Sequence, residues 1–524
     1  MNAGPARPAR PIRAGRTVLA ASLVIAMAHA RAVEQAAPDY PAIPLQWPLP
    51  YERGEQLTPL SAAIEAMRLP PSPVVTGRAP ATLQVSSCED DDSAGSLRTR
   101  IGEALSGDII DLTALTCSRI SLSQGALKIE LDSLTLRGPG ADALVLDGLD
   151  QDRILFHPGS GTLTIEDLSI ANGRFEAVSN DIGFGGCVAT GASLTLRNAV
   201  IRDCTAVGVG AYGGGVLSGF LTMVNSTISG NTAFGDHPTN GTAAYGGGAF
   251  SYGVDILDST ISGNSAIGTD NAPLSHWEIA GGLFIARNGG TIERSTFSDN
   301  FAIRFAGALT QEGDLVMRNS TVSGNVTEQD DGGGIRVRQG TSVLIENSTI
   351  AGNHAGSSGG GISFINNALP STLQSTIVAG NTAASGGTDA NSLMPLSVSG
   401  SHNLVVGSGD NLSLPADTLH ADPDLLPLAN YGGPTRTHAL GTGSIAIDRG
   451  ANPEGLSTDQ RGAGFAREFD GVADIGAFET QGQIRAPIAV PGLGRWTAAS
   501  LAGLLALLAF WRQRLGGAPR RRAP

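Results

Sequence analysis

Lysine and aromatic residues are scarce in this chain of 524 residues. Lysine occurs once, at Lys128, and phenylalanine, tryptophan and tyrosine together make up 5% of the sequence. Runs with helical periodicity are few, whereas glycine occurs 71 times. This composition argues against an α/β enzyme and is typical of a turn-rich all-β chain.

Cysteine is limited to four residues, and the pattern of a zinc site is missing. There is no Cys-x-x-Cys and no Cys/His cluster, so the sequence predicts no metal centre of that kind. An even number of cysteines in an exported chain predicts disulfides. Three pairings are open, and proximity in sequence favours Cys88–Cys117 and Cys187–Cys204.

The middle of the chain has no excess of positive charge. The chain holds 34 basic and 48 acidic residues. Ten of the basic residues lie in residues 1–30 and 491–524, so the rest of the chain has a net charge of −24. Such a surface repels nucleic acid, and we predict no nucleic-acid partner. No cofactor is predicted, although an acidic surface would suit calcium.

A seven-residue phrase, Asn-Ser-Thr-Ile-Ser-Gly-Asn in its first copy, recurs down the centre. Glycine-rich phrases such as Gly213 to Gly215 separate the copies. Their closing asparagines are 33, 36, 25, 28 and 28 positions apart, and a fixed phrase at such a variable period indicates a solenoid with insertions in its loops. The copies span residues 225–231, 258–264, 294–300, 319–325, 347–353 and, more loosely, 374–381.

Short β-branched strands that end in Gly-Asn turns predict a right-handed parallel β-helix over residues 161–400. The apolar centre of each copy should stack along the axis, and the closing asparagines should form a structural ladder. The predicted stack is Ile228, Ile261, Phe297, Val322, Ile350 and Ile377. The predicted ladder is Asn231, Asn264, Asn300, Asn325, Asn353 and Asn381.

The N-terminal region has the features of an exported chain. Residues 1–30 combine four arginines with an apolar run of 11 and an Ala-His-Ala end, which predicts a signal peptide. Residues 31–85 are a proline-rich linker. Residues 86–160 should hold the first coils and a short helix that carries Leu97, Ile101 and Leu105 on one face and covers the open end of the solenoid.

Residues 401–480 resemble the choice-of-anchor Q domain of bacterial surface proteins, with Ile445 where that family usually has proline. The resemblance implies a module between a β-helix and an anchor, and no reaction. Physically, we expect it to cap the C-terminal open end of the solenoid. The matching segments are residues 420–435, 437–440, 444–450, 458–462 and 474–479.

After a linker at 481–489, residues 490–524 resemble the IPTL-type C-terminal sorting domain, related in layout to signals read by exosortases. Residues 493–511 are 19 in number, just enough for a transmembrane helix, and the arginines beyond them should stay in the cytoplasm. The alternative is a permanent, uncleaved anchor. The motif residues are Val490, Pro491, Gly492, Leu493 and Trp496, with Val490, Gly492 and Gly494-Arg495 departing from the family pattern. The arginines are Arg512, Arg514, Arg520, Arg521 and Arg522.

Gly281 to Phe284 and Phe297 to Asn300 are similar to the repeats of polymorphic outer-membrane proteins. That similarity concerns the β-helix repeats alone.

Parallel β-helices also include polysaccharide lyases and hydrolases, which need placed carboxylates and a base. Asp330-Asp331 is present, but there is no Gly-His-Gly, and Lys128 is far away in sequence. Arg336 and Arg338 alternate with apolar residues, so we expect both to face solvent and, with Asp331, to form a patch that could grip an acidic sugar.

The leading hypothesis is therefore an exported β-helix protein without catalytic residues. It would pass a signal peptidase and an exosortase-type sorting peptidase, be held in the inner membrane before processing, and reach the surface or matrix of a Gram-negative bacterium. There it would act in adhesion to a host or cell-surface ligand, or in association with exopolysaccharide. The alternatives are a lyase or hydrolase of an acidic polysaccharide and a calcium-dependent sugar-binding module.

Overall fold

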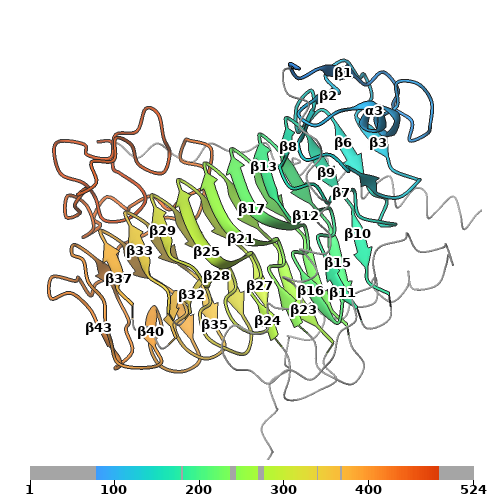
Figure 1. The fold of residues 1–524 in the computed structure, drawn as a ribbon. Coiled ribbons are helices and arrows are strands. Elements are labelled where there is room, and N and C mark those ends of the chain that lie inside the picture. Colours follow the sequence, from blue (N-terminus) through green and yellow to red (C-terminus); the bar gives the residue numbers. More distant parts are fainter. Residues whose placement is uncertain are drawn as a thin grey trace, which may run out of the picture. The chain divides into compact units, whose positions relative to one another are not determined.

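The computed structural model describes residues 78–178, 181–236, 243–269, 277–338, 340–365 and 369–482. These residues form a parallel β-solenoid of about eleven turns, of the right-handed type, in which successive coils stack as rungs (Figure 1). The predicted all-β parallel solenoid is confirmed. One short helix, α3 (Leu97–Glu103), occurs among the described residues.

Each full coil contributes strands to four rows of parallel strands, which we call sheets 1 to 4 in the order in which a coil visits them; sheets 1 and 2 are joined into one 18-stranded sheet. Sheet 1 contains β4 (Leu127–Lys128), β7 (Leu155–His157), β12 (Val188–Thr190), β28 (Leu309–Gln311), β32 (Ile335–Val337), β36 (Ile362–Phe364) and β40 (Ala390–Ser392). Sheet 2 contains β1 (Thr82–Gln84), β2 (Ile109–Asp111), β5 (Leu134–Arg137), β8 (Thr162–Glu166), β13 (Ser193–Arg197), β29 (Leu315–Arg318), β33 (Val343–Glu346) and β37 (Ser371–Gln374). Three long strands, β17 (Val216–Val224), β21 (Ala249–Leu257) and β25 (Leu283–Glu293), run through both sheets.

Sheet 3 carries the repeated phrase. It contains β3 (Arg119–Ser121), β6 (Val145–Asp147), β9 (Ser169–Ala171), β14 (Val200–Arg202), β18 (Thr227–Ser229), β22 (Thr260–Ser262), β26 (Thr296–Ser298), β30 (Thr321–Ser323), β34 (Thr349–Ala351), β38 (Ile377–Ala379) and β42 (Leu404–Val405). Sheet 4 contains β10 (Arg174–Glu176), β15 (Thr205–Gly208), β19 (Thr232–Gly235), β23 (Ser265–Gly268), β27 (Phe301–Ala302), β31 (Val326–Thr327), β35 (His354–Ala355) and β39 (Thr382–Ala383).

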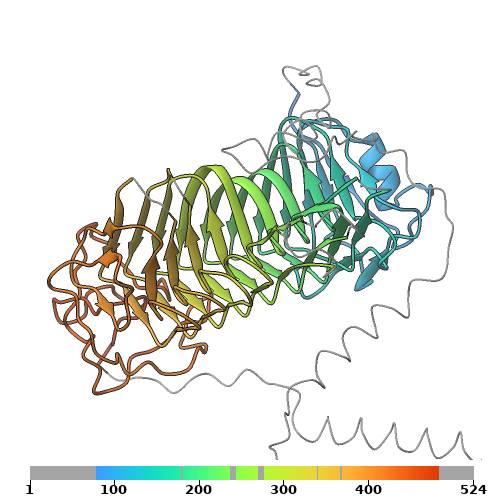
Figure 2. The same cartoon turned by 90° about the horizontal axis from the view of Figure 1, so that it is seen from below.

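An additional four-stranded outer sheet occurs in the coils between residues 182 and 279. Its strands are β11 (Ile182–Phe184), β16 (Gly210–Tyr212), β20 (Ala243–Tyr245) and β24 (Trp277–Ile279). A small pair, β41 (Leu396–Ser397) and β43 (Leu412–Ser413), belongs to the last coil. Figure 2 shows the stack of coils from below.

The repeated phrase is a strand of sheet 3 between two turns. Its first residue is left-handed, as in Asn225 with φ 48°, and its penultimate glycine is left-handed too, as in Gly230 with φ 67°. Ile228, Ile261, Phe297, Val322 and Ile350 stack in register and are fully buried, which accounts for the apolar centre of each copy.

The last member of the predicted stack is wrong. The looser copy has one extra residue, so Ile350 pairs with Val378 instead of Ile377. Val378 therefore takes the inner position, and Ile377 turns outward into a second apolar cluster with Leu404 and Tyr431. A one-residue shift moves every side chain of a strand to the other face.

The closing asparagines form a continuous ladder of amide hydrogen bonds inside the solenoid. Asn231 Nδ2 donates to Asn264 Oδ1 at 2.9 Å, and the pattern continues through Asn300, Asn325, Asn353 and Asn381 at 2.8 or 2.9 Å. Each carboxamide oxygen also accepts the backbone N–H of the preceding ladder residue, as Asn264 Oδ1 does from Asn231. The ladder thus satisfies buried polar groups of one coil with those of the next.

A serine ladder, which we did not predict, runs beside it. The backbone N–H of Ser226 donates to Ser259 Oγ, and Ser259 in turn donates to Ser295 Oγ, each at 3.1 Å. The same bond joins Ser295 to Ser320 and Ser320 to Ser348. In the sequence, this ladder is indicated by the serine at the second position of the repeated phrase.

Both predicted disulfides are present, Cys88–Cys117 and Cys187–Cys204, with Cα atoms 6.3 and 5.5 Å apart. Cys204 begins the asparagine ladder, because its backbone N–H donates to Asn231 Oδ1 at 3.0 Å. The second disulfide therefore closes the coil on which the ladder starts.

The N-terminal helix covers the first coils. Ser96 caps α3 by accepting a hydrogen bond from the backbone N–H of Thr99, and Leu97 and Ile101 are buried in the core. The prediction that Leu105 shares this face is wrong, because the helix ends at Glu103 and Leu105 is exposed. Strand β1 lies within the segment predicted as linker, so the solenoid begins before residue 86.

The described residues contain no helix that is long and apolar enough to cross a membrane. The predicted signal peptide at 1–30, the sorting motif, the apolar stretch at 493–511 and the terminal arginines all lie outside the described residues.

Candidate functional surfaces

Asp331 and Arg336, two of the three residues of the predicted ligand patch, lie buried against each other. Each residue is 6% exposed, and Arg336 Nε lies 3.5 Å from Asp331 Oδ1. Ser363 Oγ donates to Asp331 Oδ2 at 2.5 Å, and the guanidinium carbon of Arg336 is 4.0 Å from the ring centre of Phe305. The expectation that Arg336 faces solvent is wrong, because strand alternation places it on the outer face of β32 but Phe305 covers it.

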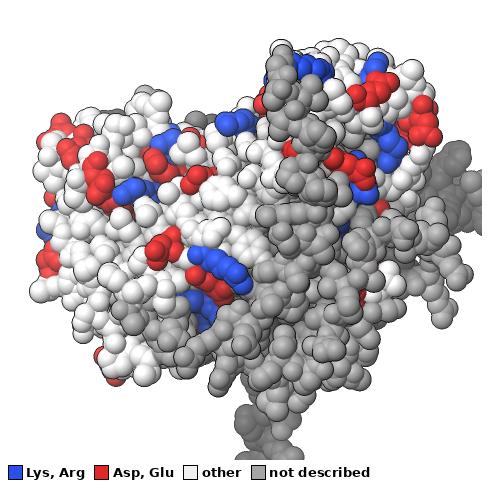
Figure 3. Space-filling view, viewed as in Figure 1, with Lys and Arg blue, Asp and Glu red and all other residues white. Residues whose placement is uncertain are grey.

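The other charged residues near this patch are also paired. Arg338 forms an ion pair with Glu312, and Arg304 Nε donates to Asp330 Oδ2 at 2.6 Å. Figure 3 shows that blue and red side chains lie next to one another on this face, within a largely uncharged surface. The residues gather as predicted, but as ion pairs rather than as an open patch.

Ion pairs also connect successive coils along the solenoid. Arg137 donates to Glu166 at 2.5 Å, and Arg318 donates to Glu346 at 2.9 Å, each pair at directly opposed positions of sheet 2. Such pairs stabilise the stacking of coils.

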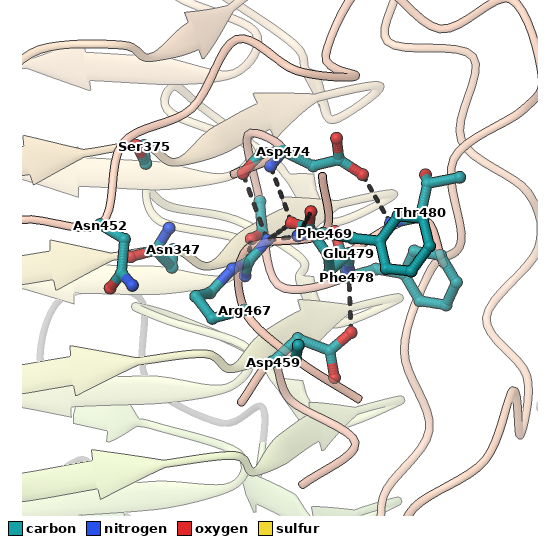
Figure 4. A network of polar contacts seen from close by, with 12 residues as sticks. Asn347, Ser375, Asn452, Asp459, Arg467, Phe469, Asp474, Phe478, Glu479 and Thr480 are labelled. Atoms are coloured by element: carbon teal, nitrogen blue, oxygen red, sulfur yellow. Dashed lines mark hydrogen bonds and ion pairs between the residues drawn. The ribbon is translucent and has the colours of Figure 1, made fainter. Parts of the chain in front are cut away.

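The C-terminal module, residues 420–480, is organised around a buried arginine (Figure 4). Arg467 is fully buried and donates to Glu479 Oε2 at 2.8 Å and to the carbonyl oxygen of Gly476 at 2.8 Å. Glu479 also accepts the backbone N–H groups of Phe469 and Asp474 at 2.9 and 2.8 Å. Asp474, Gly476 and Glu479 belong to the segment 474–479 of the choice-of-anchor Q resemblance, whereas Arg467 lies between two of its segments.

Burial dominates the electrostatics of this network. It raises the pKa of Glu479 to about 7, against the lowering effect of Arg467, and it raises the pKa of Asp474 as well.

The predicted cap spanned residues 401–480, but residues 401–419 continue the solenoid through β42 and β43. The module of residues 420–480 lies along the side of the solenoid and not over its end. Its residues bind the outer face of sheet 3 across several coils. Thr321 Oγ1 donates to Gln460 Oε1 at 2.5 Å, and His438 Nε2 and Ser323 Oγ are 2.9 Å apart. Arg467 Nη1 donates to Asn319 Oδ1 at 3.3 Å, so the central arginine also reaches the solenoid.

This placement divides the outer face of sheet 3 into two parts. The outward threonines of β26, β30 and β34 are buried under the module, whereas Thr227 of β18 and Thr260 of β22 are half-buried. Gly476 sits at the contact with φ 104°, and a Cβ atom there would lie 2.8 Å from Ile377 Cδ1 and from Thr349 Oγ1. A glycine is therefore required for this close approach.

A shallow hollow of about 280 Å³ lies at the junction of sheets 1 and 2. The half-buried rings of Phe220 and Tyr252 line it together with Ser193 and the exposed Ser160 and Asn288. Phe220 lies over Gly253 of the next coil, where a Cβ atom would come within 2.9 Å of the ring.

A two-residue insertion in β25 forms one wall of this hollow. Ser251 pairs with Ile285 and Gly253 pairs with Gly289, so Tyr252 alone faces three residues that include Arg287 and Asn288. Arg287 is left-handed with φ 75°, and its guanidinium carbon is 6.0 Å from the ring centre of Tyr252. This hollow was not predicted. Its signal in the sequence is the segment Arg287 to Gly290, which interrupts the alternation of a long strand.

Among the described residues, no group of three or more His, Cys, Asp or Glu side chains is arranged to hold a metal ion.

No protein-family model matches the sequence, and no curated protein matches it either. Among solved structures, the chain is similar to the crystal structure of pectate lyase Pel9A, at 13% sequence identity and a TM-score of 0.38. The match covers 77% of this chain and 97% of that chain.

Proposed function

We propose that this chain is an exported, surface-sorted β-solenoid with a non-catalytic role in adhesion or in association with exopolysaccharide. The observation that carries the proposal is the attachment of the C-terminal module along the flank of the solenoid. About eleven coils at about 4.8 Å each make a rod roughly 50 Å long. The module binds the coils in the C-terminal part of this rod.

The module is the segment that leads toward the predicted sorting tail. Because Arg467, Gln460 and Gly476 contact several coils, a pull on the tail would be shared among those coils rather than peeling off the last one. The module resembles an anchor domain and binds several coils of the solenoid. This arrangement suits the display of the solenoid at a cell surface.

The state of Asp331 and Arg336 supports a role without catalysis. A lyase or hydrolase needs an acid or base that can reach its substrate. These two residues are buried, and they neutralise each other. The alternative, a lyase or hydrolase of an acidic polysaccharide, would require this pair to open.

For the route to the surface, we propose signal peptidase and an exosortase-type sorting peptidase as processing partners, with passage through the inner membrane of a Gram-negative bacterium. The resemblances of residues 1–30 and 490–524 support this route.

Cell fractionation of the full chain, beside a variant that lacks residues 490–524, tests the proposal. We expect the full chain in the membrane and at the surface, and the truncated chain in the medium or periplasm. Mass spectrometry should find the mature chain ending near Pro491. Full-length protein in the cytoplasm would overturn the proposal, and a surface protein that retains Arg522 would refute the cleavage step alone.

A further inference from the structure

We infer that the hollow between Phe220 and Tyr252 binds a neutral sugar ring of an extracellular glycan. This inference rests on the proposed function, because it names the ligand class for that role.

The chemistry of the lining favours a sugar. Phe220 and Tyr252 present aromatic surface, and Ser160, Ser193 and Asn288 present hydroxyl and amide groups. A pyranose has one apolar face of C–H groups and an equator of hydroxyls, so aromatic stacking combined with neutral hydrogen-bonding groups matches both. No residue that lines the hollow carries a charge, and the guanidinium carbon of Arg287 is 6.0 Å from the ring centre of Tyr252. A neutral lining of this kind favours an uncharged sugar.

The size of the hollow limits what enters it. Its volume of about 280 Å³ is slightly below the roughly 300–1,000 Å³ typical of small-molecule sites. One sugar ring is therefore held while the rest of the glycan lies on the surface. A single such site binds weakly, with a Kd on the order of 1 mM.

The fold maintains this shape at a conformational cost. The ring of Phe220 rests on Gly253, which has no side chain to displace it. The wall opposite depends on the insertion in β25 and on a left-handed arginine, Arg287. A left-handed non-glycine residue is strained, and such strain is concentrated at functional sites.

The experiment measures retention of the full chain in native gels that contain a neutral polysaccharide, such as a β-glucan or a galactomannan, or an acidic one, such as pectin or alginate. We expect a neutral gel to retard the chain. Phe220→Ala should weaken this binding roughly tenfold, and the exposed Asn288→Ala should weaken it without disturbing the fold. Phe301→Ala, which removes a half-buried ring from sheet 4, is the matched control and should bind as the unmodified chain does.

The other outcomes separate the two proposals. Neutral-glycan binding that survives both Phe220→Ala and Asn288→Ala overturns the hollow as the site but leaves the proposed function standing. Binding to acidic polysaccharide alone overturns the ligand class inferred here. If no gel retards the full chain, the hollow is not a glycan site and the exopolysaccharide-associated role fails with it.

Discussion

Asn381 donates both its backbone N–H and its side-chain amide to one carboxylate oxygen of Asp389, at 2.9 Å each. The second oxygen of Asp389 accepts the backbone N–H of Gly407 at 2.8 Å. The ladder is directional, because each asparagine donates toward the C-terminus, and Asp389 ends it with a group that only accepts. Burial raises the pKa of this carboxyl, although these donors favour its ionised form.

The ladder provides the first prediction. Asn325→Ala removes the acceptor of two donors of Asn300, its backbone N–H and its Nδ2. Two buried donors without partners should lower the free energy of unfolding by roughly 2–4 kcal/mol. Urea unfolding measures this loss. The control is Asn225→Gly at an exposed left-handed turn, where we expect a change within about 0.5 kcal/mol, and an equal loss in both variants would contradict a ladder that carries stability.

A second prediction concerns the attachment of the module. Arg467→Met leaves Glu479 buried without its cation, which should cost about 3–5 kcal/mol. Hydrogen exchange should speed up in residues 420–480 and on β26, β30 and β34, with little change in β6 or β9. Arg449→Met, which replaces an exposed arginine of the module, is the matched control and should leave exchange unchanged. If exchange in the Arg467 variant speeds up equally in all coils, the module does not act only on the coils that it contacts, and this prediction is refuted.

The pH dependence of the module follows from Glu479. Its pKa of about 7 in the folded state exceeds its ordinary value of 4.5, so the folded module binds the proton more tightly than the unfolded chain does. The stability contribution is complete below about pH 4.5 and is lost as the pH rises to about 7, by about 3 kcal/mol.

Hydrogen exchange of residues 420–480 at pH 5 and pH 8, corrected for the intrinsic rate, checks this direction. Glu479→Gln cannot ionise and should remove much of the difference, with the remainder assigned to Asp474, whose pKa is raised in the same direction. A module that becomes more stable as the pH rises through this range would show that the ionised carboxylate is favoured, contrary to our account.

Disulfide removal should act locally as well. A double Cys187→Ser, Cys204→Ser variant opens a loop of 17 residues and should lose about 3 kcal/mol. The loss should be concentrated in the coils where the ladder begins, whereas reduction of Cys88–Cys117 should expose α3 and β1. Hydrogen exchange distinguishes the two cases, and identical protection maps would argue against separate roles.

The repeat made the interior of the solenoid predictable. Ile228 and Asn231 occupy the same place in each copy, so their neighbours could be inferred from spacing alone, and the extra residue in the last copy explains why Ile377 failed this rule. The serine ladder was equally visible, because Ser226 also keeps its place in the copies, but no role was assigned to that position. The outer sheet does not follow coil length, because β16 lies in a coil of only 27 residues, from Val200 to its partner Thr227.

Contacts between distant segments were not predictable in the same way. Strand alternation correctly predicts that Arg336 lies on the outer face of β32. Its burial depends on Phe305, which packs over it and comes from another part of the chain. The module could be identified by its segments, yet its position depends on the approach of Gly476 to Ile377 and Thr349, about a hundred residues earlier in the chain. The hollow needs Phe220 and Asn288 from different coils, and neither strand alone indicates a site.

The most direct test of the central claim is a single incubation of the full chain with neutral and acidic polysaccharides, in which bound protein and polymer chain length are both measured. Our account predicts that protein co-sediments with a neutral polymer and that all polymers keep their length. Shortening of pectin or alginate that Arg336→Ala abolishes would contradict the account and would establish catalysis at the pair formed with Asp331.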